Sequence, residues 1–428
     1  MLNKLIEYNK MKNLTYVDFF AGVGGFRYGI DSFQKSHPEY TFECIKTSDI
    51  KKDAIQTYNL NFKENNEACD IRTIKDLPYF DILCAGFPCQ PFSSAGKKLG
   101  LKDEGRGDLI YEVIRICKES KPSFLILENV SNIELIEKGE VLKLIVKEFE
   151  NIGYNVSCVS INALDVGLAQ NRNRVFIIGN RIKPVEISIK KKTPATIKDI
   201  IDSSDTATDI PENFVQKLLD LKMENIIGKS IKDKRGGDSN IHSWDIEYNG
   251  KISDRQKKLL NNILLERRKK KWATEKNMTW MDGIPLSLED IKTFDDYDEL
   301  EKDLEDLVSK KYLVMEHPKD LIDGKRVQNI NIPIGYNISK GKLSFPVSKI
   351  LHPDEKCPTL TATDSNKLAV CVGKTIRRLN AMELKRLCGF PESMLLPENV
   401  KMYDLFGNMV CPTVITSILE SLLPQFDD

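Results

Sequence analysis

Cys89 is the residue whose surroundings best suit it to act as a nucleophile. It stands in the run 86–93, GFPCQPFS, where prolines before and after it restrain the backbone. The apolar run 79–85 predicts a buried strand, so the chain turns at Pro88 and Cys89. Open α/β sheets bind their ligands beyond the carboxyl ends of parallel strands, where this thiol would lie. A lone cysteine is more often an inert core residue, so a functional role depends on its companions.

A glycine-rich turn follows the first expected strand. Residues 18–26 read DFFAGVGGF, and glycines between a strand and a helix let the backbone approach a ligand closely. The spacing Gly-x-Gly-Gly is not the dinucleotide fingerprint, and no phosphate-loop Lys-Ser/Thr pair follows it. On its own, this turn fits a ligand site and a purely structural role equally well.

Two acids end the segments that come after this turn. Asp49 follows the second expected strand and Asp70 ends the next segment, and an acid at such a strand end can hold a ribose diol. Acids at successive strand ends suit an adenosyl ligand. The alternative for each acid is a helix cap, because aspartate accepts hydrogen bonds from the first N–H groups of a helix.

A glutamate and two arginines occupy later strand ends. Glu128 ends the apolar run 123–127 at the same expected sheet edge as Cys89, where partial burial would raise its pKa and allow proton donation. The run 170–174, QNRNR, enters the last strand of this part, and alternate arginines there suit a phosphate or a base carbonyl. The alternatives are an N-cap or surface acid for Glu128 and a solvated edge for the arginines.

The elements that must position these residues alternate between strand and helix up to residue 180. This rhythm predicts a doubly wound α/β sheet that is parallel or mostly parallel. The expected strands are 14–20, 40–46, 79–85, 123–127, 156–161 and 175–179, and the expected helices include 108–119, 141–152 and one near 412–423.

The alternation of strand and helix patterns ends in the middle of the chain. Residues 181–370 are polar, lysine-rich and irregular, with helices expected at 255–271 and around 295–307. Regular α/β patterns resume at 377. We therefore expect two domains, an α/β domain made of 12–180 plus 375–428 and a smaller inserted domain of 181–374.

Composition narrows the class of protein. Lysine plus arginine equals aspartate plus glutamate at 63 each, but 251–280 has ten basic and three acidic residues and 289–306 has ten acidic and two basic. These opposed patches leave nucleic-acid binding open. Ten scattered cysteines and four histidines argue against a zinc site and a disulfide framework. With no signal-peptide pattern in 1–12 and no run expected to approach a membrane span, a cytoplasmic protein is expected.

In their order along the chain, these motifs resemble those of the cytosine-C5 DNA methyltransferase family. The run 377–391 is similar to the family's ninth motif, 407–410, GNMV, to its last, and 359–362, TLTA, to the Thr-Leu that closes its target-recognition region. The resemblance covers 14–180 and 357–423. It implies a Rossmann-like S-adenosylmethionine-dependent methyltransferase fold with an inserted target-recognition domain.

Three positions depart from the residues usual in the family. Asn380 stands where Thr is common, Ala169 where Pro often precedes the glutamine, and Met409 where Ser is usual. Met409 bears on one cofactor contact, although a backbone contact would survive the change. None alters the expected roles of Cys89 and Glu128.

The resemblance implies methylation at C5 of a cytosine flipped out of duplex DNA. Cys89 would add to C6, Glu128 would hold N3 and the exocyclic amine, and Arg174 would contact O2. Arg172 would support a nearby phosphate or Cys89. Further DNA contacts are expected from Gln90, Ser93, Gln170, Arg235 and Thr359.

The implied methyl donor is S-adenosylmethionine, which leaves as S-adenosylhomocysteine, and no metal is expected. Asp49 would hold the ribose and Asp70 the adenine amine. The other residues expected around this cofactor are Phe20, Gly22, Gly24, Gly25, Ile50, Ile71, Pro88, Leu109 and Asn408.

The inserted region is the expected DNA-clamping domain. Its basic run 267–271 either binds phosphate or solvates the back of a helix whose apolar positions within 259–264 form a buried stripe. The loop 234–237, KRGG, is the better candidate for base contacts, because Arg235 on a glycine-rich loop can enter the major groove.

Other classes of protein share part of this pattern. A nicotinamide or flavin oxidoreductase has a glycine turn but no use for the Pro-Cys-Gln turn. The tRNA-methylating branch of the same family has a compact recognition region with a Cys-Phe-Thr signature, which is not found here. A catalytically dead DNA-binding module would not need Cys89. The expected partner is double-stranded DNA, bound by a monomer, and a restriction endonuclease acting on the same site without a stable complex would fit this arrangement.

Overall fold

The structure is a computed structural model that describes residues 12–88, 109–233, 236–279, 282–322, 325–339 and 345–426. These residues form two compact units. The described parts of the first unit lie within 12–202, 353–365 and 380–426, and those of the second within 203–352 and 366–379. The chain therefore passes into the second unit twice and returns to the first unit each time.

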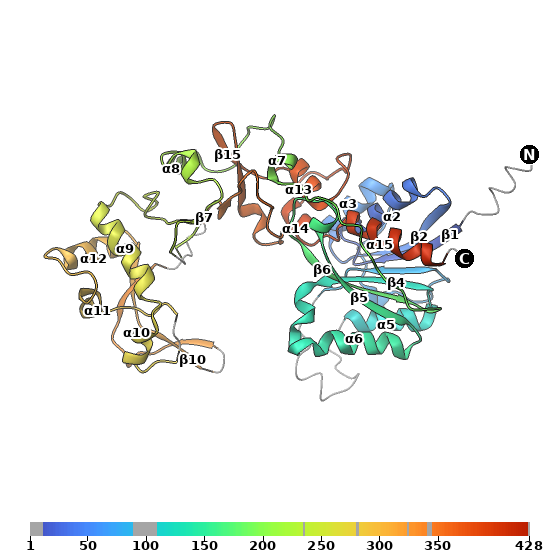
Figure 1. The fold of residues 1–428 in the computed structure, drawn as a ribbon, viewed down its shortest axis with the longest axis horizontal. Coiled ribbons are helices and arrows are strands. Elements are labelled where there is room, and N and C mark those ends of the chain that lie inside the picture. Colours follow the sequence, from blue (N-terminus) through green and yellow to red (C-terminus); the bar gives the residue numbers. More distant parts are fainter. Residues whose placement is uncertain are drawn as a thin grey trace, which may run out of the picture. The chain divides into compact units, whose positions relative to one another are not determined.

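A six-stranded sheet forms the centre of the first unit (Figure 1). Its order is β2 (Tyr40–Ser48), β1 (Lys12–Phe19), β3 (Ile82–Ala85), β4 (Phe124–Val130), β6 (Asn173–Asn180) and β5 (Asn155–Asn162). β1 pairs in parallel with β2 and β3, and β3 with β4, whereas β6 runs antiparallel to both β4 and β5. The prediction of a doubly wound, mostly parallel sheet is confirmed, with β6 as its reversed strand.

Helices cover both faces of this sheet (Figure 1). α5 (Leu109–Ser120) and α6 (Glu140–Asn151) lie on one face, and α2 (Gly25–Ser36) and α15 (Pro412–Leu422) lie on the other. The remaining helices of the first unit are α3 (Lys52–Phe62), α7 (Ile197–Ile200), α13 (Ala381–Cys388) and α14 (Met402–Gly407).

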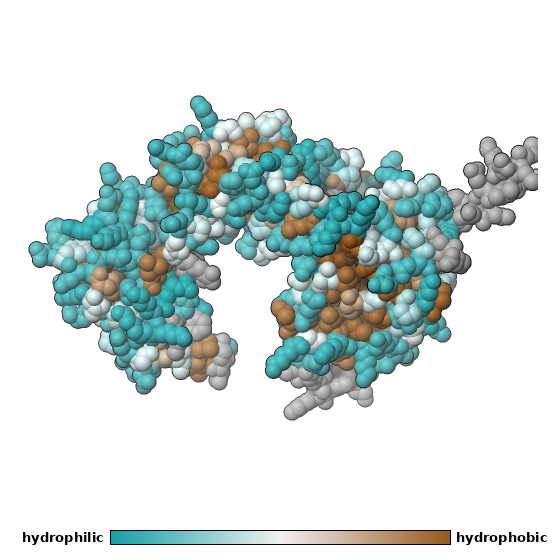
Figure 2. All heavy atoms as spheres, in the orientation of Figure 1, coloured by the Kyte–Doolittle hydropathy of each residue, from teal (hydrophilic) through white to brown (hydrophobic). Residues whose placement is uncertain are grey.

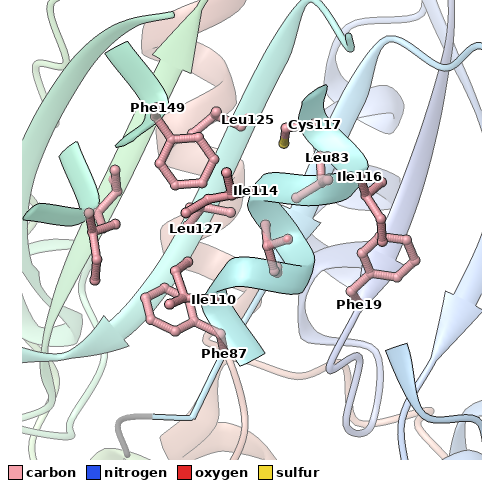
Figure 3. Packing of buried hydrophobic residues seen from close by; sticks show 14 of the residues in the cluster. Phe19, Leu83, Phe87, Ile110, Ile114, Ile116, Cys117, Leu125, Leu127 and Phe149 are labelled. Atoms are coloured by element: carbon pink, nitrogen blue, oxygen red, sulfur yellow. The ribbon is translucent and has the colours of Figure 1, made fainter. Parts of the chain in front are cut away.

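The core between the sheet and the pair α5 and α6 fixes the strand that carries the predicted glutamate. Ile110 and Ile114 of α5 and Phe149 of α6 share a buried cluster with Leu125 and Leu127 of β4 (Figure 3). Full burial of one such side chain contributes about 1.5–3 kcal/mol. The end of β4 therefore projects its side chains from a firmly packed strand.

The C-terminal stretch Met402–Phe426 is, by length and composition, apolar enough to cross a membrane. This corrects the expectation that no run approaches a membrane span. The stretch is mostly buried in the first unit and contains two separate helices, α14 and α15. A Cβ on Gly29 of α2 would lie 2.6 Å from Ile415 of α15, so these two helices pack very closely. A core position accounts for the apolar character of this stretch.

The second unit contains a five-stranded sheet and a helical part, with a visible surface that is mainly hydrophilic (Figure 2). The sheet order is β15 (Thr375–Arg378), β14 (Leu368–Val372), β13 (Lys349–Ile350), β7 (Ser230–Ile231) and β8 (Asn240–Ile241). Two-stranded pairs join β9 (Leu313–Glu316) to β12 (Gly335–Ile338) and β10 (Lys319–Ile322) to β11 (Lys325–Gln328). The helices are α8 (Glu212–Leu219), α9 (Asp254–Glu266), α10 (Lys270–Glu275), α11 (Leu288–Lys292) and α12 (Leu300–Ser309).

Two expected helices of this unit have different bounds. The helix expected at 255–271 is two helices, because Lys269 has an extended backbone between α9 and α10. The acidic helix begins at Leu300 rather than near 295. The apolar stripe within 259–264 is buried, and Arg267 of the basic run is buried too, donating to Asn337 Oδ1 at 2.6 Å.

The return of the chain to the first unit explains one unusual residue. Asn380 is the N-cap of α13, and its side chain accepts a hydrogen bond from the Glu383 N–H at 2.9 Å, while Glu383 accepts from the Asn380 N–H. Asn and Thr both serve as N-caps, so the substitution preserves the capping box.

Candidate active site

A cavity of about 580 Å³ lies in the first unit at the carboxyl ends of β1, β2, β3 and β4. It is lined by residues at or just after the end of each strand and, later in the chain, by 360–362, 404–405 and 407–408. The predicted site residues in the lining are Phe20, Gly22, Asp49, Ile50, Asp70, Ile71, Pro88, Leu109, Glu128, Arg172, Arg174 and Asn408. Motifs that are far apart in the sequence thus meet at one edge of the sheet.

The glycines of the first turn divide between two tasks. Gly22 has φ +55 and open space where a Cβ would stand, and it lines the cavity. Gly24 and Gly25, predicted for the same site, are not lining residues. Gly24 has φ +89 at the start of α2, and a Cβ on Gly25 would lie 2.1 Å from the carbonyl oxygen of Val410. These two glycines permit the turn and the close approach of the C-terminal segment.

Asp49 holds the glycine turn in place. Its Oδ2 accepts a hydrogen bond from the Gly22 N–H at 2.9 Å, and its Oδ1 accepts one from the Lys51 N–H at 2.8 Å. A carboxylate oxygen has two lone pairs, so each oxygen of Asp49 can accept another hydrogen bond. The acid can therefore bind a diol without releasing the turn.

Asp70 follows a residue that is bonded to the Asp49 segment, because the Cys69 N–H donates to Asp49 O at 2.9 Å, and it lies beside an arginine. It caps the 3₁₀-helix Ile71–Thr73 by accepting from the Arg72 N–H at 3.0 Å, and the Arg72 Nε lies 3.0 and 3.1 Å from its two oxygens. These hydrogen bonds hold the pKa of Asp70 below its ordinary value. Asp70 is therefore a helix cap, as the alternative interpretation predicts, and it also lines the cavity.

Glu128 and Arg174 form a buried ion pair in the lining of the cavity. Glu128 Oε1 lies 2.9 Å from Arg174 Nε, and in the antiparallel pairing of β4 with β6 Arg174 is opposite Val130, two residues after Glu128. Burial raises the pKa of Glu128, and the charges of Arg174 and Arg172 only partly oppose that shift. Neither alternative, a surface acid or a solvated edge, describes this buried pair.

Asn129 connects this strand end to the turn that precedes Cys89. Its Nδ2 donates to the carbonyl oxygen of Phe87 at 3.0 Å in a buried hydrogen bond. Phe87 is itself buried in the core cluster. Asn129 thus fixes the chain immediately before Pro88.

Gln170, Arg172 and Thr359 are held within the first unit. The Gln170 side chain is fully buried and bonded at both ends of its amide, and Thr359 Oγ1 donates to Asn171 O at 2.5 Å. The Arg172 guanidinium donates to three backbone carbonyl oxygens, those of Leu360, Gly407 and Met409. Met409, one of the unusual positions, uses its backbone for this contact.

Four predicted site residues, Cys89, Gln90, Ser93 and Arg235, lie outside the described residues. Others that line the cavity were not among the predicted site residues, namely Val23, Ser48, Lys51, Ala54, Cys69, Arg72, Gly86, Phe87, Asn129, Val130, Leu360, Thr361, Ala362, Asp404, Leu405 and Gly407. Lys51 and Asp404 form an ion pair at 2.9 Å between segments that are far apart in the chain. No local pattern marks such a pair. In the part of the chain that the structure describes, no cluster of three or more His, Cys, Asp or Glu side chains could hold a metal ion.

The lining of this cavity suits an adenosyl methyl donor. Asp49 and Asp70 supply acceptor oxygens for a diol and an amine, Gly22 exposes backbone, and Ile50 and Ile71 offer apolar surface for a flat ring. Ile50 is 69% exposed in this structure, so a bound ring would bury it. The donor set therefore matches the chemistry of such a ligand.

Comparison with known proteins also points to a methyltransferase. The sequence profile of C-5 cytosine-specific DNA methylases matches residues 14–423. The Type II methyltransferase M.NlaIV of Neisseria lactamica is 41% identical over 425 residues, covering 96% of this chain and 99% of that one. M.BanI of Aneurinibacillus aneurinilyticus is 36% identical over 433 residues, covering 96% and 95%. A DNA modification methyltransferase structure from an E. coli prophage matches with a TM-score of 0.51 at 20% identity, covering 97% of this chain and 100% of that one, and supports the fold.

A match over nearly the whole chain, together with relatives of this identity and coverage, decides the family. The family also implies a methyl donor of the S-adenosylmethionine type. The chain belongs to the C-5 cytosine-specific DNA methylase family.

Proposed function

We propose that this protein transfers a methyl group from S-adenosylmethionine to C5 of a cytosine in a specific duplex DNA sequence. The observation that carries the proposal is the buried pair of Glu128 and Arg174, which shares one cavity with Asp49 and Asp70. A site for a base and a site for an adenosyl donor are thereby continuous.

Glu128 recognises and activates the base. Its raised pKa favours the protonated carboxyl, which can donate to N3 of cytosine and accept from the exocyclic amine. Arg174 stands beside it with donors suited to O2 of the base. These two side chains match the edge of cytosine and stabilise the ring as it accepts electrons.

Cys89 is the nucleophile of the proposed reaction. Its thiolate adds to C6, so the electron pair of the C5–C6 double bond becomes available at C5 and attacks the methyl group. The methyl donor supplies an electrophilic carbon on a sulfonium leaving group. Loss of the C5 proton to a base then re-forms the double bond as the Cys89 sulfur leaves C6. Neither metal nor redox chemistry is required to balance these steps.

Asp49, Asp70 and the backbone at Gly22 are the proposed groups that hold the methyl donor. Asp49 would bind the ribose diol and Asp70 the adenine amine, with Ile50, Ile71 and Leu109 against the ring. Phe20, Pro88 and Asn408 complete the site. Gly24 and Gly25 support it through the turn.

The second unit is the proposed target-recognition domain. A base stacked within a duplex cannot reach the cavity, so the cytosine must be flipped out. Gln90 and Ser93 are proposed to follow the DNA backbone beside the site, and Arg235 to contact bases. In terms of the domains expected from the sequence, we propose a catalytic role for 12–180 with 375–428 and a recognition role for 181–374, which contains most of the second unit.

The Type II names of the relatives support a role as the modification enzyme of a restriction-modification system. A restriction endonuclease would then recognise the same site without forming a stable complex. We propose a monomer in the cytoplasm that acts on double-stranded DNA, and these relatives favour DNA over tRNA as the substrate.

Bisulfite sequencing of DNA from cells expressing the protein tests this function. The expected result is protection of one cytosine in a recurring sequence, with none in cells expressing Cys89→Ser. Unmodified DNA alongside a folded protein that binds S-adenosylmethionine would overturn the proposal.

A further inference from the structure

Two segments of the first unit, 169–172 and 357–360, are joined along their length. The Cys357 N–H donates to Ala169 O at 2.7 Å, and the Asn171 N–H donates to Cys357 O at 2.8 Å. The Leu360 N–H donates to the Oε1 of Gln170 at 3.0 Å. We call the segment 357–362 the strip. Backbone and side-chain hydrogen bonds thus hold the strip against the residues that immediately precede β6.

Arg172 joins the strip to a second wall of the cavity. One guanidinium nitrogen donates to Leu360 O at 3.1 Å and to Gly407 O at 3.2 Å, and another donates to Met409 O at 2.6 Å. Gly407 lies so close to the strip that a Cβ on it would stand 2.3 Å from the Ala362 nitrogen. Hydrogen bonds and close packing thus hold the strip against the segment that carries Asn408.

Gln170 and Arg172 are poorly placed to contact DNA themselves. Gln170 is fully buried, and its Nε2 donates to Leu387 O at 3.0 Å while its Oε1 accepts from Leu360. Arg172 is 3% exposed, and its outer nitrogens are used on backbone carbonyls. A buried guanidinium that donates to several backbone carbonyl oxygens in this way holds protein segments in place.

The strip also has a special position in the chain. It lies in the stretch 353–365 of the first unit, and this stretch continues at both ends into the second unit. Leu360, Thr361 and Ala362 line the cavity. The same few residues are therefore both the covalent connection to the second unit and a wall of the cavity.

We propose that Gln170 and Arg172 are positioning residues that couple target-DNA binding by the second unit to methyl-donor binding in the cavity, acting through the strip. This inference rests on the proposed function. When the second unit binds DNA, movement at either end of the strip shifts the strip residues that line the cavity. The hydrogen bonds of Arg172 then shift Gly407 and Met409 as well. By linkage, target DNA and the methyl-donor product each tighten binding of the other.

The test is calorimetric titration of S-adenosylhomocysteine into the full-length protein, alone and with a saturating duplex that carries the site found by bisulfite sequencing. For the wild type, the duplex tightens binding about fivefold or more, in the usual range of allosteric coupling. Arg172→Lys keeps the charge but loses the planar fork, and reduces the effect of the duplex to less than twofold. Thr359→Val, a milder change that removes the hydrogen bond from the strip to Asn171 O, partly reduces the effect of the duplex.

Asn180→Ala is the matched control. Asn180 is a fully buried polar residue at the opposite end of β6, donating to Ser123 O at 3.1 Å. Asn180→Ala should lower the melting temperature but leave the coupling between duplex and S-adenosylhomocysteine binding unchanged. If Arg172 had only a structural role, Arg172→Lys would likewise lower the melting temperature without changing the coupling. Retention of the wild-type coupling in both Arg172→Lys and Thr359→Val overturns the inference, as does a wild type that methylates DNA without coupling. A wild type that does not methylate DNA instead contradicts the proposed function.

Discussion

Glu128 Oε1 lies 2.9 Å from Arg174 Nε in a buried ion pair, and both residues line the cavity that Asp49 and Asp70 also line. The glutamate comes from β4 and the arginine from the antiparallel strand β6, so the sheet itself sets the distance between them. Burial raises the pKa of the glutamate, and the positive charge of Arg174 partly offsets the cost of burying its carboxylate.

Glu128→Gln should reduce kcat by about 10²–10⁴-fold, because the amide cannot supply the proton that the base requires. Binding of S-adenosylhomocysteine should remain near the wild-type value. Methyl transfer measured under single-turnover conditions checks the effect. Glu134→Gln, on an acid outside the cavity lining, is the control and should retain full activity. Equal activity of both variants would remove Glu128 from the chemistry.

Asp49→Ala should weaken S-adenosylhomocysteine binding by about 10–100-fold, since it removes a charged acceptor and loosens the glycine turn. Asp53→Ala is matched to it, because Asp53 is an acid of the neighbouring α3 that does not line the cavity. Titration calorimetry measures both. An Asp49 variant that binds as tightly as the Asp53 variant would contradict the assignment of the ribose site.

Asp18 should make stability fall as pH rises. The side chain is fully buried at the end of β1, neither carboxylate oxygen has a hydrogen-bond partner among the described residues, and burial raises its pKa to about 8. Between the ordinary value of 3.8 and 8, the folded protein keeps this proton and the unfolded chain releases it. Unfolding is therefore favoured by up to about 1.4 kcal/mol per pH unit in that window, and the effect levels off above it.

Asp18→Asn removes this titration. The free energy of unfolding of the variant relative to wild type should rise steadily between pH 5 and 8, as measured by urea denaturation. A difference that stays constant over that range would show that Asp18 is ionised in the folded protein.

Gly25→Ala should destabilise the protein more than Gly22→Ala does. A Cβ on Gly25 meets the backbone oxygen of Val410 at 2.1 Å, and overpacking of this kind costs about 1–3 kcal/mol or more. Gly22 has open space, so alanine there incurs only the strain of φ +55, about 1 kcal/mol. Melting temperatures of the two variants decide the order, and a lower value for Gly22→Ala would reverse it.

Much of the sheet could be predicted from sequence, because apolar runs at regular spacing report buried strands directly. The same reasoning brought Asp49, Asp70 and Glu128 to one edge of the sheet. It could not separate Gly22 from Gly24 and Gly25, because a Cβ would meet Phe62 at Gly24 and Val410 at Gly25, and these neighbours come from other parts of the chain. Nor could it assign Gln170 and Arg172 to the strip, since their partners come from almost 200 residues further along the chain and no local pattern encodes them.

Covalent trapping tests the central claim most directly. The protein is incubated with S-adenosylmethionine and a duplex that carries 5-fluorocytosine at the target position, where the fluorine cannot leave as a proton does. The wild type should form an adduct that survives denaturation and whose mass equals protein plus methylated DNA, with the link mapped to Cys89, and Cys89→Ser should form none. Methylation of ordinary cytosine without any trapped adduct, or an adduct at another residue, would contradict the account.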